Sequence, residues 1–395
     1  MVLVREVGPG IQWVGAIDWD RRLFDALIPL PDGTSYNSYL VKGSEKTALI
    51  DGVDTTMVDV LLENLESLGL RKLDYIVSQH AEQDHSEAIS KLVKVYPEAQ
   101  ILASARCMDL LVAFSLVPPD RVREVKNGEK VSLGDKTLEF IHAPWVHWPD
   151  TLFTYVPESK ILFTCDFLGS HLATSDLYAN DEARVYKSAK RYYAEIMMPF
   201  RTQIQKHLAR VNQINPEVIA PSHGPLYRNP KFILDAYADW SSDKVKNQVV
   251  LPFVSMHGAT KAMIDYFTDA LISRGIFVQP YDLTKSDVGK IAESLVDAAT
   301  VVVGSPTVLA GAHPAAIYVA FLANALRPKA KFASIIGSYG WGGKMPEQIS
   351  QAISNLKVEV LQPVIAKGYP KEEDLKALDR LADDVASRHK GMGLL

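Results

Sequence analysis

Residues Gln79–His85 read QHAEQDH and place two histidines and two carboxylates within six positions. The apolar run Leu73–Ser78 precedes them and predicts a buried strand, and the segment EAISKLVKVYP that follows predicts a helix. Side chains on such a strand-to-helix loop can converge on one point. A solvated loop with scattered charges would be the simpler interpretation for one His and one Glu, but four potential ligands so close together favour a metal site.

The composition is that of an ordinary folded protein, with 395 residues that suffice for two or more domains and with 47% hydrophobic and 23% charged residues. A net charge of −5 gives no electrostatic basis for binding nucleic acid or anionic lipid. No stretch approaches the roughly 18 apolar residues of a membrane span, and the N-terminus lacks the apolar core of a signal peptide. Cys107 and Cys165 exclude a disulfide framework and form no C-x-x-C pair. We therefore expect a cytoplasmic protein without nucleic acid or membrane partners.

The first part of the chain alternates short strands with helices. Short apolar runs separated by Gly, Pro, Asp and Asn predict antiparallel strands at Ile11–Ile17, Leu23–Leu30, Ser38–Val41 and Thr47–Ile50. Val58–Leu68 shows helical spacing and ends at Gly69. Beyond the QHAEQDH stretch, a helix around LLVAF lies among further strands at Ile101–Ala103, Val131–Leu133 and Thr137–Ile141. This alternation predicts an α/β sandwich with its sites on loops.

Three more potential ligands follow apolar runs. His147 comes after LEFIHAPWV, Asp166 after KILFTC and His223 after VIAPS. A lone histidine after a strand is usually a structural residue. Because α/β sheets gather functional groups at the carboxyl ends of their strands, we expect these three side chains to share one rim with His80.

In order, His80, Glu82, Asp84, His85, His147, Asp166 and His223 reproduce the ligand series of the metallo-β-lactamase-like fold. Many hydrolases of that superfamily carry a second His where this chain has Glu82. With HWPD at 147–150 and SHG at 222–224, the pattern resembles the flavodiiron proteins (A-type flavoproteins) over nearly the whole chain.

The resemblance implies that His80, Glu82 and His147 bind one iron, that Asp84 and His223 bind a second, and that Asp166 bridges them; His85 is a further potential ligand. In such a site the three negative charges of Glu82, Asp84 and Asp166 would nearly balance the four positive charges of two divalent metal ions. Mixed carboxylate and imidazole ligands suit iron or manganese, whereas zinc has no redox chemistry. We expect hydrogen-bonding partners for these ligands among His171, Tyr192 and Tyr193, with ordinary core roles as the alternative, and structural or surface roles for His142 and His207.

A polar segment, Ser241–Asn247, predicts a linker between a domain at 1–247 and a second at 248–395. Beyond it, strands predicted at Val249–Val254, Ile276–Tyr281, Thr300–Val303, Lys331–Ile336 and Glu359–Val364 alternate with helices that include Thr260–Ser273, Val288–Ala298, Ile317–Leu326 and Glu372–Arg388. Five strands alternating with five helices predict a doubly wound parallel five-stranded sheet.

Three loops at the carboxyl ends of these strands predict a flavin site. The first, S-x-x-G-x-T, is neither G-x-G-x-x-G nor a P-loop, and it resembles the phosphate loop of flavodoxins, which hold FMN. The other two loops, residues 305–309 and 337–343, lie beside the expected switch point of the sheet, where flavodoxin-like domains bind FMN. The predicted FMN contacts are Ser255, Met256, His257, Gly258, Ala259, Thr260, Ser305, Pro306, Thr307, Val308, Leu309, Ser338, Tyr339, Gly340, Trp341 and Gly342.

We therefore expect an N-terminal metallo-β-lactamase-like αββα sandwich with a non-haem diiron centre, and a C-terminal flavodoxin-like domain with FMN. The resemblance implies an oxidoreductase that reduces dioxygen to water, nitric oxide to nitrous oxide, or both. The alternatives are a dinuclear zinc hydrolase fused to a flavodoxin-like module, against which Glu82 argues, and a non-enzymatic electron carrier, against which the full ligand set argues.

Neither a rubredoxin-like cysteine pattern nor a nicotinamide fingerprint is present, so we expect an external electron donor such as rubredoxin or a reduced deazaflavin. The resemblance also implies a head-to-tail homodimer, with a dimer of dimers as a larger assembly. The chain departs from some family members at Trp19–Asp25, WDRRLFD, where those members carry a His. The sequence does not rank the two gases, because both would use the same ligands.

Overall fold

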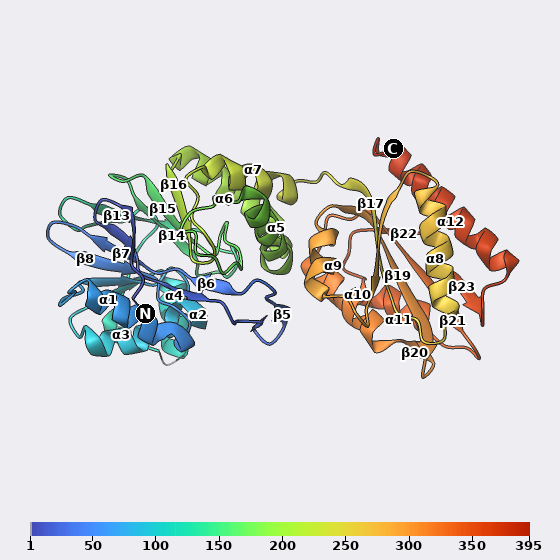
Figure 1. Cartoon of the computed structure of the whole chain (residues 1–395), viewed down its shortest axis with the longest axis horizontal. Coiled ribbons are helices and arrows are strands. Elements are labelled where there is room, and N and C mark those ends of the chain that lie inside the picture. The colour runs from blue at the N-terminus through green and yellow to red at the C-terminus, as the bar shows by residue number, and fades with distance from the viewer. Residues whose placement is uncertain (1, 115) are drawn as a thin grey trace. The chain divides into compact units, whose positions relative to one another are not determined.

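The computed structural model describes residues 2–114 and 116–395 (Figure 1). The chain divides into two compact units, one made of residues 1–193 and 200–241 and the other of residues 194–199 and 242–395. Helix α7 (Pro230–Ser241) ends where unit 1 ends, and four residues separate it from strand β17 (Lys246–Phe253). The connecting segment, Ser242–Val245, is therefore shorter than the linker predicted from composition.

Unit 1 is a sandwich of two sheets between two layers of helices, which confirms the predicted αββα architecture (Figure 1). The first sheet has the order β1 (Arg5–Gly8), β2 (Ile11–Trp13), β7 (Tyr39–Lys42), β8 (Thr47–Ile50), β9 (Tyr75–Val77), β10 (Gln100–Ala103) and β11 (Val122–Glu124). The second has the order β12 (Lys130–Ser132), β13 (Thr137–His142), β14 (Leu152–Val156), β15 (Ile161–Cys165) and β16 (Val218–Pro221). The helices are α1 (Val58–Ser67), α2 (Gln83–Ser86), α3 (Ile89–Val95), α4 (Ala105–Ala113), α5 (Glu182–Tyr192), α6 (Arg201–Ile214) and α7.

The central strands of the first sheet are buried on both faces. Because successive side chains of a strand point to opposite faces, alternate residues pack against α1, α3 and α4, and the residues between them pack against the second sheet. The helix-facing layer contains Leu49, Ile76 and Ile101. The sheet-facing layer contains Ile50, Val77 and Leu102, which pack with Phe140, Leu152 and Phe163 of the second sheet.

The strands of the first fifty residues pair antiparallel, as predicted, and the parallel pairs of the first sheet begin where β8 meets β9. Two other sequence-based expectations for unit 1 were wrong in detail. The run Ile11–Ile17 is split between β2 and β3 (Ala16–Asp18), since Gly15 lies so close to Tyr36 and Asn37 that a Cβ there would clash with their backbone. The run Leu23–Leu30 is a small hairpin of β4 (Leu23–Phe24) and β5 (Ile28–Pro29), turned by Asp25 and Ala26 at positive φ.

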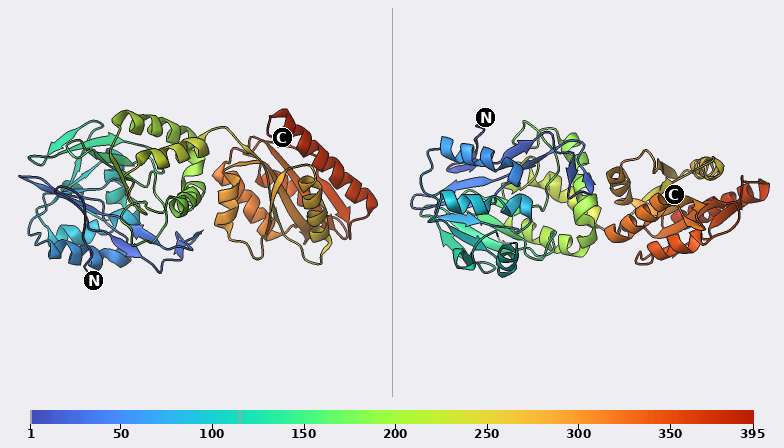
Figure 2. Two further views of the ribbon diagram at one scale, coloured as in Figure 1. Left: turned by 45° about the horizontal axis from the view of Figure 1, so that its top comes forward. Right: turned by 90° about the horizontal axis from the view of Figure 1, so that it is seen from below.

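Unit 2 is a doubly wound parallel sheet, as predicted. Its order is β18 (Phe277–Asp282), β17, β19 (Ala298–Val308), β21 (Phe332–Tyr339) and β22 (Glu359–Val360), and all of these pairs are parallel. Helices α8 (Ala259–Ile272) and α12 (Glu372–Gly391) cover one face, and α9 (Val288–Leu295), α10 (Pro314–Leu326) and α11 (Met345–Ala352) cover the other (Figures 1 and 2). The buried face under α8 and α12 forms one continuous core.

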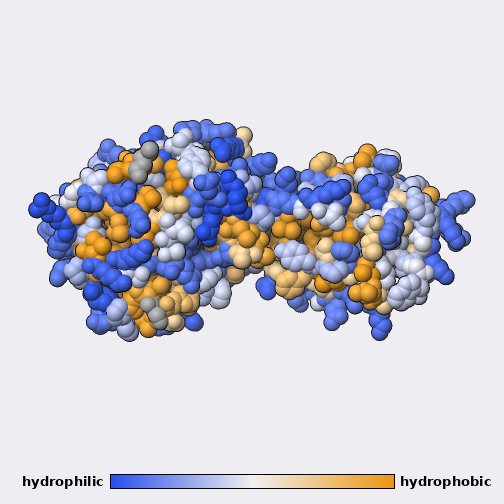
Figure 3. Space-filling model, turned by 60° about the horizontal axis from the view of Figure 1, so that its bottom comes forward, coloured by the Kyte–Doolittle hydropathy of each residue, from blue (hydrophilic) through white to orange (hydrophobic). Residues whose placement is uncertain are grey.

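Two element bounds in unit 2 correct the sequence analysis. The fifth strand, expected at Glu359–Val364, is two short strands, β22 and β23 (Val364–Lys367), both paired with β21. The helix expected to reach Ala298 ends at Leu295, because the buried run from Ala298 onward belongs to β19. The described residues contain no helix that is both long and apolar enough to cross a bilayer. Hydrophilic and apolar side chains are interspersed on the surface of each unit (Figure 3).

Candidate functional site

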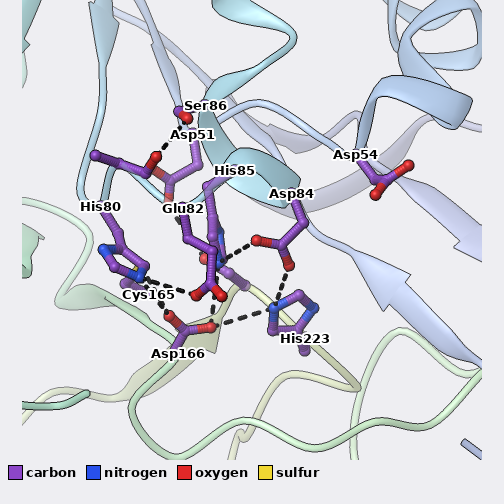
Figure 4. Close-up of polar contacts among 12 residues, drawn as sticks. Asp51, Asp54, His80, Glu82, Asp84, His85, Ser86, Cys165, Asp166 and His223 are labelled. Carbon is purple, nitrogen blue, oxygen red and sulfur yellow. Dashed lines mark hydrogen bonds and ion pairs between the residues drawn. The ribbon is translucent and has the colours of Figure 1, made fainter. Parts of the chain in front are cut away.

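All seven predicted ligands converge on one place in unit 1, and Figure 4 shows six of them with their polar contacts. His80 follows β9 of the first sheet, and α2 then carries Asp84 and His85. His147, Asp166 and His223 follow β13, β15 and β16, which belong to the second sheet. The candidate ligands, which were expected along one sheet edge, therefore come from two sheets. Asp84 and His85 lie on a helix, because α2 begins inside the stretch that was predicted to be a loop.

One group of ligand atoms surrounds Glu82. Its Oε2 lies 3.1 Å from His80 Nε2 and 3.0 Å from His147 Nε2. Asp166 Oδ2 lies 3.7 and 3.6 Å from the same two nitrogen atoms. Metal–ligand bonds of ~2.1 Å put neighbouring ligand atoms about 3.0–3.4 Å apart, so this group fits a single metal ion.

A second group shares Asp166 with the first. His223 Nε2 lies 3.2 Å from Asp84 Oδ2 and 3.2 Å from Asp166 Oδ1. His85 Nε2 lies 3.2 Å from Asp166 Oδ1 and 3.4 Å from Asp84 Oδ1, which places His85 inside this group (Figure 4). The two oxygens of Asp166 face different groups, the arrangement that a bridging carboxylate needs.

Hydrogen bonds behind the site orient these ligands. His80 Nδ1 lies 3.1 Å from both oxygens of Asp150, and Asp150 Oδ2 also accepts a hydrogen bond from Ala81 N. His223 Nδ1 donates to Ser35 O at 2.8 Å, and the Tyr192 hydroxyl donates to Asp166 Oδ1 at 2.9 Å. Since Nδ1 carries the proton in such pairs, Nε2 is left free to bind a metal.

Asp51, at the end of β8, ties two ligand loops together. It accepts hydrogen bonds from Gln79 N at 2.8 Å, from Gln79 Nε2 at 3.2 Å and from Ser222 Oγ at 3.1 Å. These donors stand directly before His80 and His223, so one buried carboxylate sets the position of a loop from each sheet.

The carboxylates of the site carry negative charge that nearby cationic groups stabilise. Burial alone would lower the pKa of His85 and His223, but Asp84 and Asp166 raise it to about 9 for His85 and about 10 for His223. Burial would raise the pKa of Glu82, yet His147 and His80 hold it well below its usual value. Without metal, imidazolium groups thus balance the carboxylates, and a metal ion can take over that role by displacing protons.

Unit 2 contains a cavity of about 340 Å³ at the carboxyl ends of its strands. Three predicted loops line it together with one that the sequence analysis missed; the lining residues are Ser255, Met256, His257, Ala259, Thr260, Pro306, Thr307, Ser338, Tyr339, Gly340, Gly368 and Tyr369. The cavity lies at the N-terminus of α8, where Gly258 has a φ of +89° that favours glycine. Hydroxyl groups and a helix N-terminus suit a phosphate, so the residues present fit FMN.

Comparison with known proteins gives one match within unit 1 and others over nearly the whole chain. Residues 34–224 match the family described as ODP family beta lactamase. The chain is 36% identical to a nitric oxide reductase of Moorella thermoacetica, over 96% of this chain and 97% of that protein. It superposes on the rubredoxin oxygen:oxidoreductase of Desulfovibrio gigas with a TM-score of 0.95 (29% identity, 98% and 99% coverage), and on a flavodiiron protein of Giardia intestinalis with a TM-score of 0.93 (28% identity, 99% and 98% coverage).

The chain belongs to the flavodiiron protein family. Similarity over nearly the full length of these relatives makes it an oxidoreductase and supports that activity over the alternative of a zinc hydrolase. A flavodiiron protein needs a flavin and a non-haem diiron site, and the cavity of unit 2 and the ligand groups of unit 1 have the residues for them.

Some predicted flavin contacts of this flavodiiron protein do not line the cavity. The Leu309 and Trp341 side chains are 94% and 78% exposed, and Val308 pairs with Gly311 in a short hairpin. Ser305 is buried, and its Oγ accepts a hydrogen bond from His313 N. Gly258 and Gly342 are also outside the cavity lining.

The other polar candidates take different places. Tyr192 contacts Asp166 as described, whereas Tyr193 packs against Tyr237 and Trp240. His142 and His207 bond to the carbonyls of Val125 and Pro144, which confirms their structural assignment.

Sequence reasoning missed four residues that the structure places at these two sites, Asp150, Asp51, Gly368 and Tyr369. Asp150 belongs to the HWPD stretch and Asp51 directly follows a predicted strand, so each carries a usable signal. Gly368 and Tyr369 follow β23, which was not separated from the strand before it.

Proposed function

We propose that this flavodiiron protein reduces dioxygen to water, nitric oxide to nitrous oxide, or both, with FMN in the cavity of unit 2 and two iron ions in unit 1. The observation that carries the proposal is the sharing of Asp166: each of its two oxygens lies within 3.7 Å of two histidine nitrogen atoms, and the two histidine pairs belong to different ligand groups. That geometry supports a pair of metals rather than one.

His80, Glu82 and His147 would hold one iron, Asp84 and His223 the other, and Asp166 both, with His85 as an additional ligand of the second. When bound, the irons would supply the site for the gas, and FMN would supply electrons singly or in pairs. The protein's own part is to fix these ligands: Asp150 and Ser35 O hold the tautomers of His80 and His223, and Asp51 holds the two loops. The carboxylate content supports iron over zinc.

Electrons would come from an external donor, and rubredoxin or a reduced deazaflavin are the candidates. The Desulfovibrio gigas relative is named a rubredoxin oxygen:oxidoreductase, which supports rubredoxin as a candidate. We further propose that the chain acts in the cytoplasm as a head-to-tail homodimer, or as a dimer of such dimers, in which each FMN serves the irons of the partner subunit.

Metal and flavin analysis of anaerobically purified protein, followed by anaerobic stopped-flow of the reduced protein against each gas, tests the proposal. We expect about two irons and one FMN per chain and oxidation of the flavin by at least one gas on mixing. Stoichiometric zinc, with no gas turnover after iron reconstitution, would overturn it. Rapid turnover with NADH and no partner protein would contradict the external donor.

A further inference from the structure

His171 lies beside the second ligand group without bonding to any of its members. It follows Asp166 by five residues and is buried to more than nine-tenths, with 8% exposed. Its ring centroid lies 5.1 Å from that of His223, 4.8 Å from Tyr192 and 5.2 Å from Phe24. The ring is therefore enclosed by one expected iron ligand and by two aromatic side chains.

Two hydrogen bonds hold His171 in a defined orientation. The Ser188 hydroxyl donates to the His171 carbonyl at 2.7 Å, and Nδ1 lies 3.0 Å from Thr34 Oγ1. The Thr34 hydroxyl has a second acceptor within reach, Ser35 O, but at the longer distance of 3.3 Å. We assign the Thr34 proton to the shorter contact with Nδ1, and this assignment puts the ring proton of His171 on Nε2.

That Nε2–H group is buried and has no hydrogen-bond partner among the described residues. A buried donor without a partner costs about 1–3 kcal/mol, and such groups in native structures call for an explanation. With its proton on Nε2 and with Nδ1 accepting from Thr34, the ring is neutral and brings a donor without a further positive charge.

We propose that His171 is a further residue of the gas site, whose Nε2–H donates a hydrogen bond to the small ligand bound beside Asp84, His85 and His223. The inference rests on the proposed function and adds a contact to it. A protonated ring nitrogen cannot bind a metal, and no ligand side chain accepts from it, which leaves a bound small molecule as the acceptor. A donor fixed in a water-poor site stabilises an electron-rich ligand with little reorganisation.

Three substitutions separate the two ring nitrogens. His171→Asn keeps a polar atom near Nδ1 and its bond to Thr34, His171→Gln can place one near Nε2, and His171→Phe keeps only the aromatic packing. We would measure iron content, the affinity of the iron-loaded protein for azide, and kcat and KM for each gas. His207→Asn is the matched control, because His207 is equally buried in the same unit and bonds to Pro144 O.

We expect His171→Asn and His171→Phe to keep their iron but to bind azide about tenfold more weakly, the effect of one hydrogen bond of about 1.4 kcal/mol. His171→Gln should recover part of that loss, and His207→Asn should bind azide like the wild type. Thr34→Val should weaken azide binding by less than His171→Asn, because it removes the hydrogen bond that fixes the tautomer of His171 but leaves Nε2 in place.

Wild-type azide affinity in His171→Asn would overturn the inference, and so would loss of iron from that variant, which would assign His171 to holding His223. The azide titration also separates this inference from the proposed function. A wild-type protein that turns over neither gas refutes the function, whereas the effect of His171 on azide is read without turnover.

Discussion

Glu82 carries the negative charge that distinguishes this site from one with a second histidine at the same position. Its Oε2 lies within 3.1 Å of the Nε2 atoms of both His80 and His147, so its loss would leave two imidazoles without their shared partner. The charge count from the sequence and the contacts in the structure both make Glu82 a candidate ligand of the first iron. Removing its carboxylate therefore tests that assignment directly.

Glu82→Ala should lower the iron content from about two to about one per chain, because only the group around Glu82 is broken. Gas turnover should fall by about 100-fold or more, while FMN binding in unit 2 is unchanged. Metal analysis, flavin absorbance and stopped-flow measure the three quantities. Glu98→Ala, at an exposed carboxylate, is the control. Retention of both irons by Glu82→Ala would show that Glu82 is not a ligand.

The histidines of the metal-free site predict an unusual pH dependence. His85 and His223 have pKa values of about 9 and about 10, raised from 6.5 by Asp84 and Asp166 against the effect of burial. Between pH 6.5 and these values the folded chain binds more protons than the unfolded chain, so its free energy of unfolding falls as the pH rises. Thermal melts of chelator-treated protein from pH 6 to 10 should show this fall, and His223→Gln should reduce its slope.

Iron loading provides an independent check on the same protons. Ferrous iron added at pH 7 to the metal-free protein in weak buffer should release protons, because a metal can bind these histidines only after they are deprotonated. A pH-independent melting temperature together with iron binding that releases no protons would contradict the protonated state of the metal-free site.

At the scale of residues, the convergence of the seven candidate ligands could be predicted because each stands next to a recognisable strand or helix signal. Their partners could not be assigned in the same way. Asp150 reaches His80 across 70 positions and Asp51 reaches Ser222 across 171, and such contacts depend on how two sheets stack rather than on spacing along the chain. The orientation of His171 depends on Thr34 in the same manner.

At the scale of elements, the periodicity of apolar residues was enough to predict the long helices and buried strands. The errors occurred where backbone geometry determines the bounds of an element. Helix α1 buries Val58, Leu61 and Leu65 on one face, as its spacing indicates. The split of Ile11–Ile17 depends instead on the close approach of Gly15 to Asn37, and neighbouring residues do not reveal that approach. Helix α2 is one turn long, too short for a periodic signal.

Gly304 in β19 shows how a strand of unit 2 packs against α8. A Cβ at this position would lie 2.6 Å from Phe253 Cβ and 2.8 Å from Ile264 Cδ1, closer than atoms can pack. Gly304→Ala should therefore lower the stability of unit 2 by about 1–3 kcal/mol and weaken FMN binding. Differential scanning calorimetry and flavin release measure both effects. Gly391→Ala, which meets nothing within 4 Å, should leave them unchanged; equal stability of the two variants would contradict this packing argument.

At the scale of the whole molecule, the two expected redox centres are built in separate units. The ligand groups belong to unit 1, and the cavity that fits FMN belongs to unit 2. Electron transfer requires such centres to come close, and the head-to-tail dimer proposed above would pair each cavity with the ligand groups of the partner subunit.

A mixed dimer tests electron transfer between chains. One parent chain would carry Asp84→Ala and His223→Ala, which remove ligands of the second iron, and the other would carry Gly258→Val and Thr260→Ala, which disturb the α8 end of the flavin cavity. Neither homodimer should turn over gas. After subunit exchange, half of the centres in each heterodimer pair an intact FMN with intact irons of the partner, so activity should return in part. Native mass spectrometry would verify the exchange, and verified heterodimers without recovered activity would show that electrons stay within one chain.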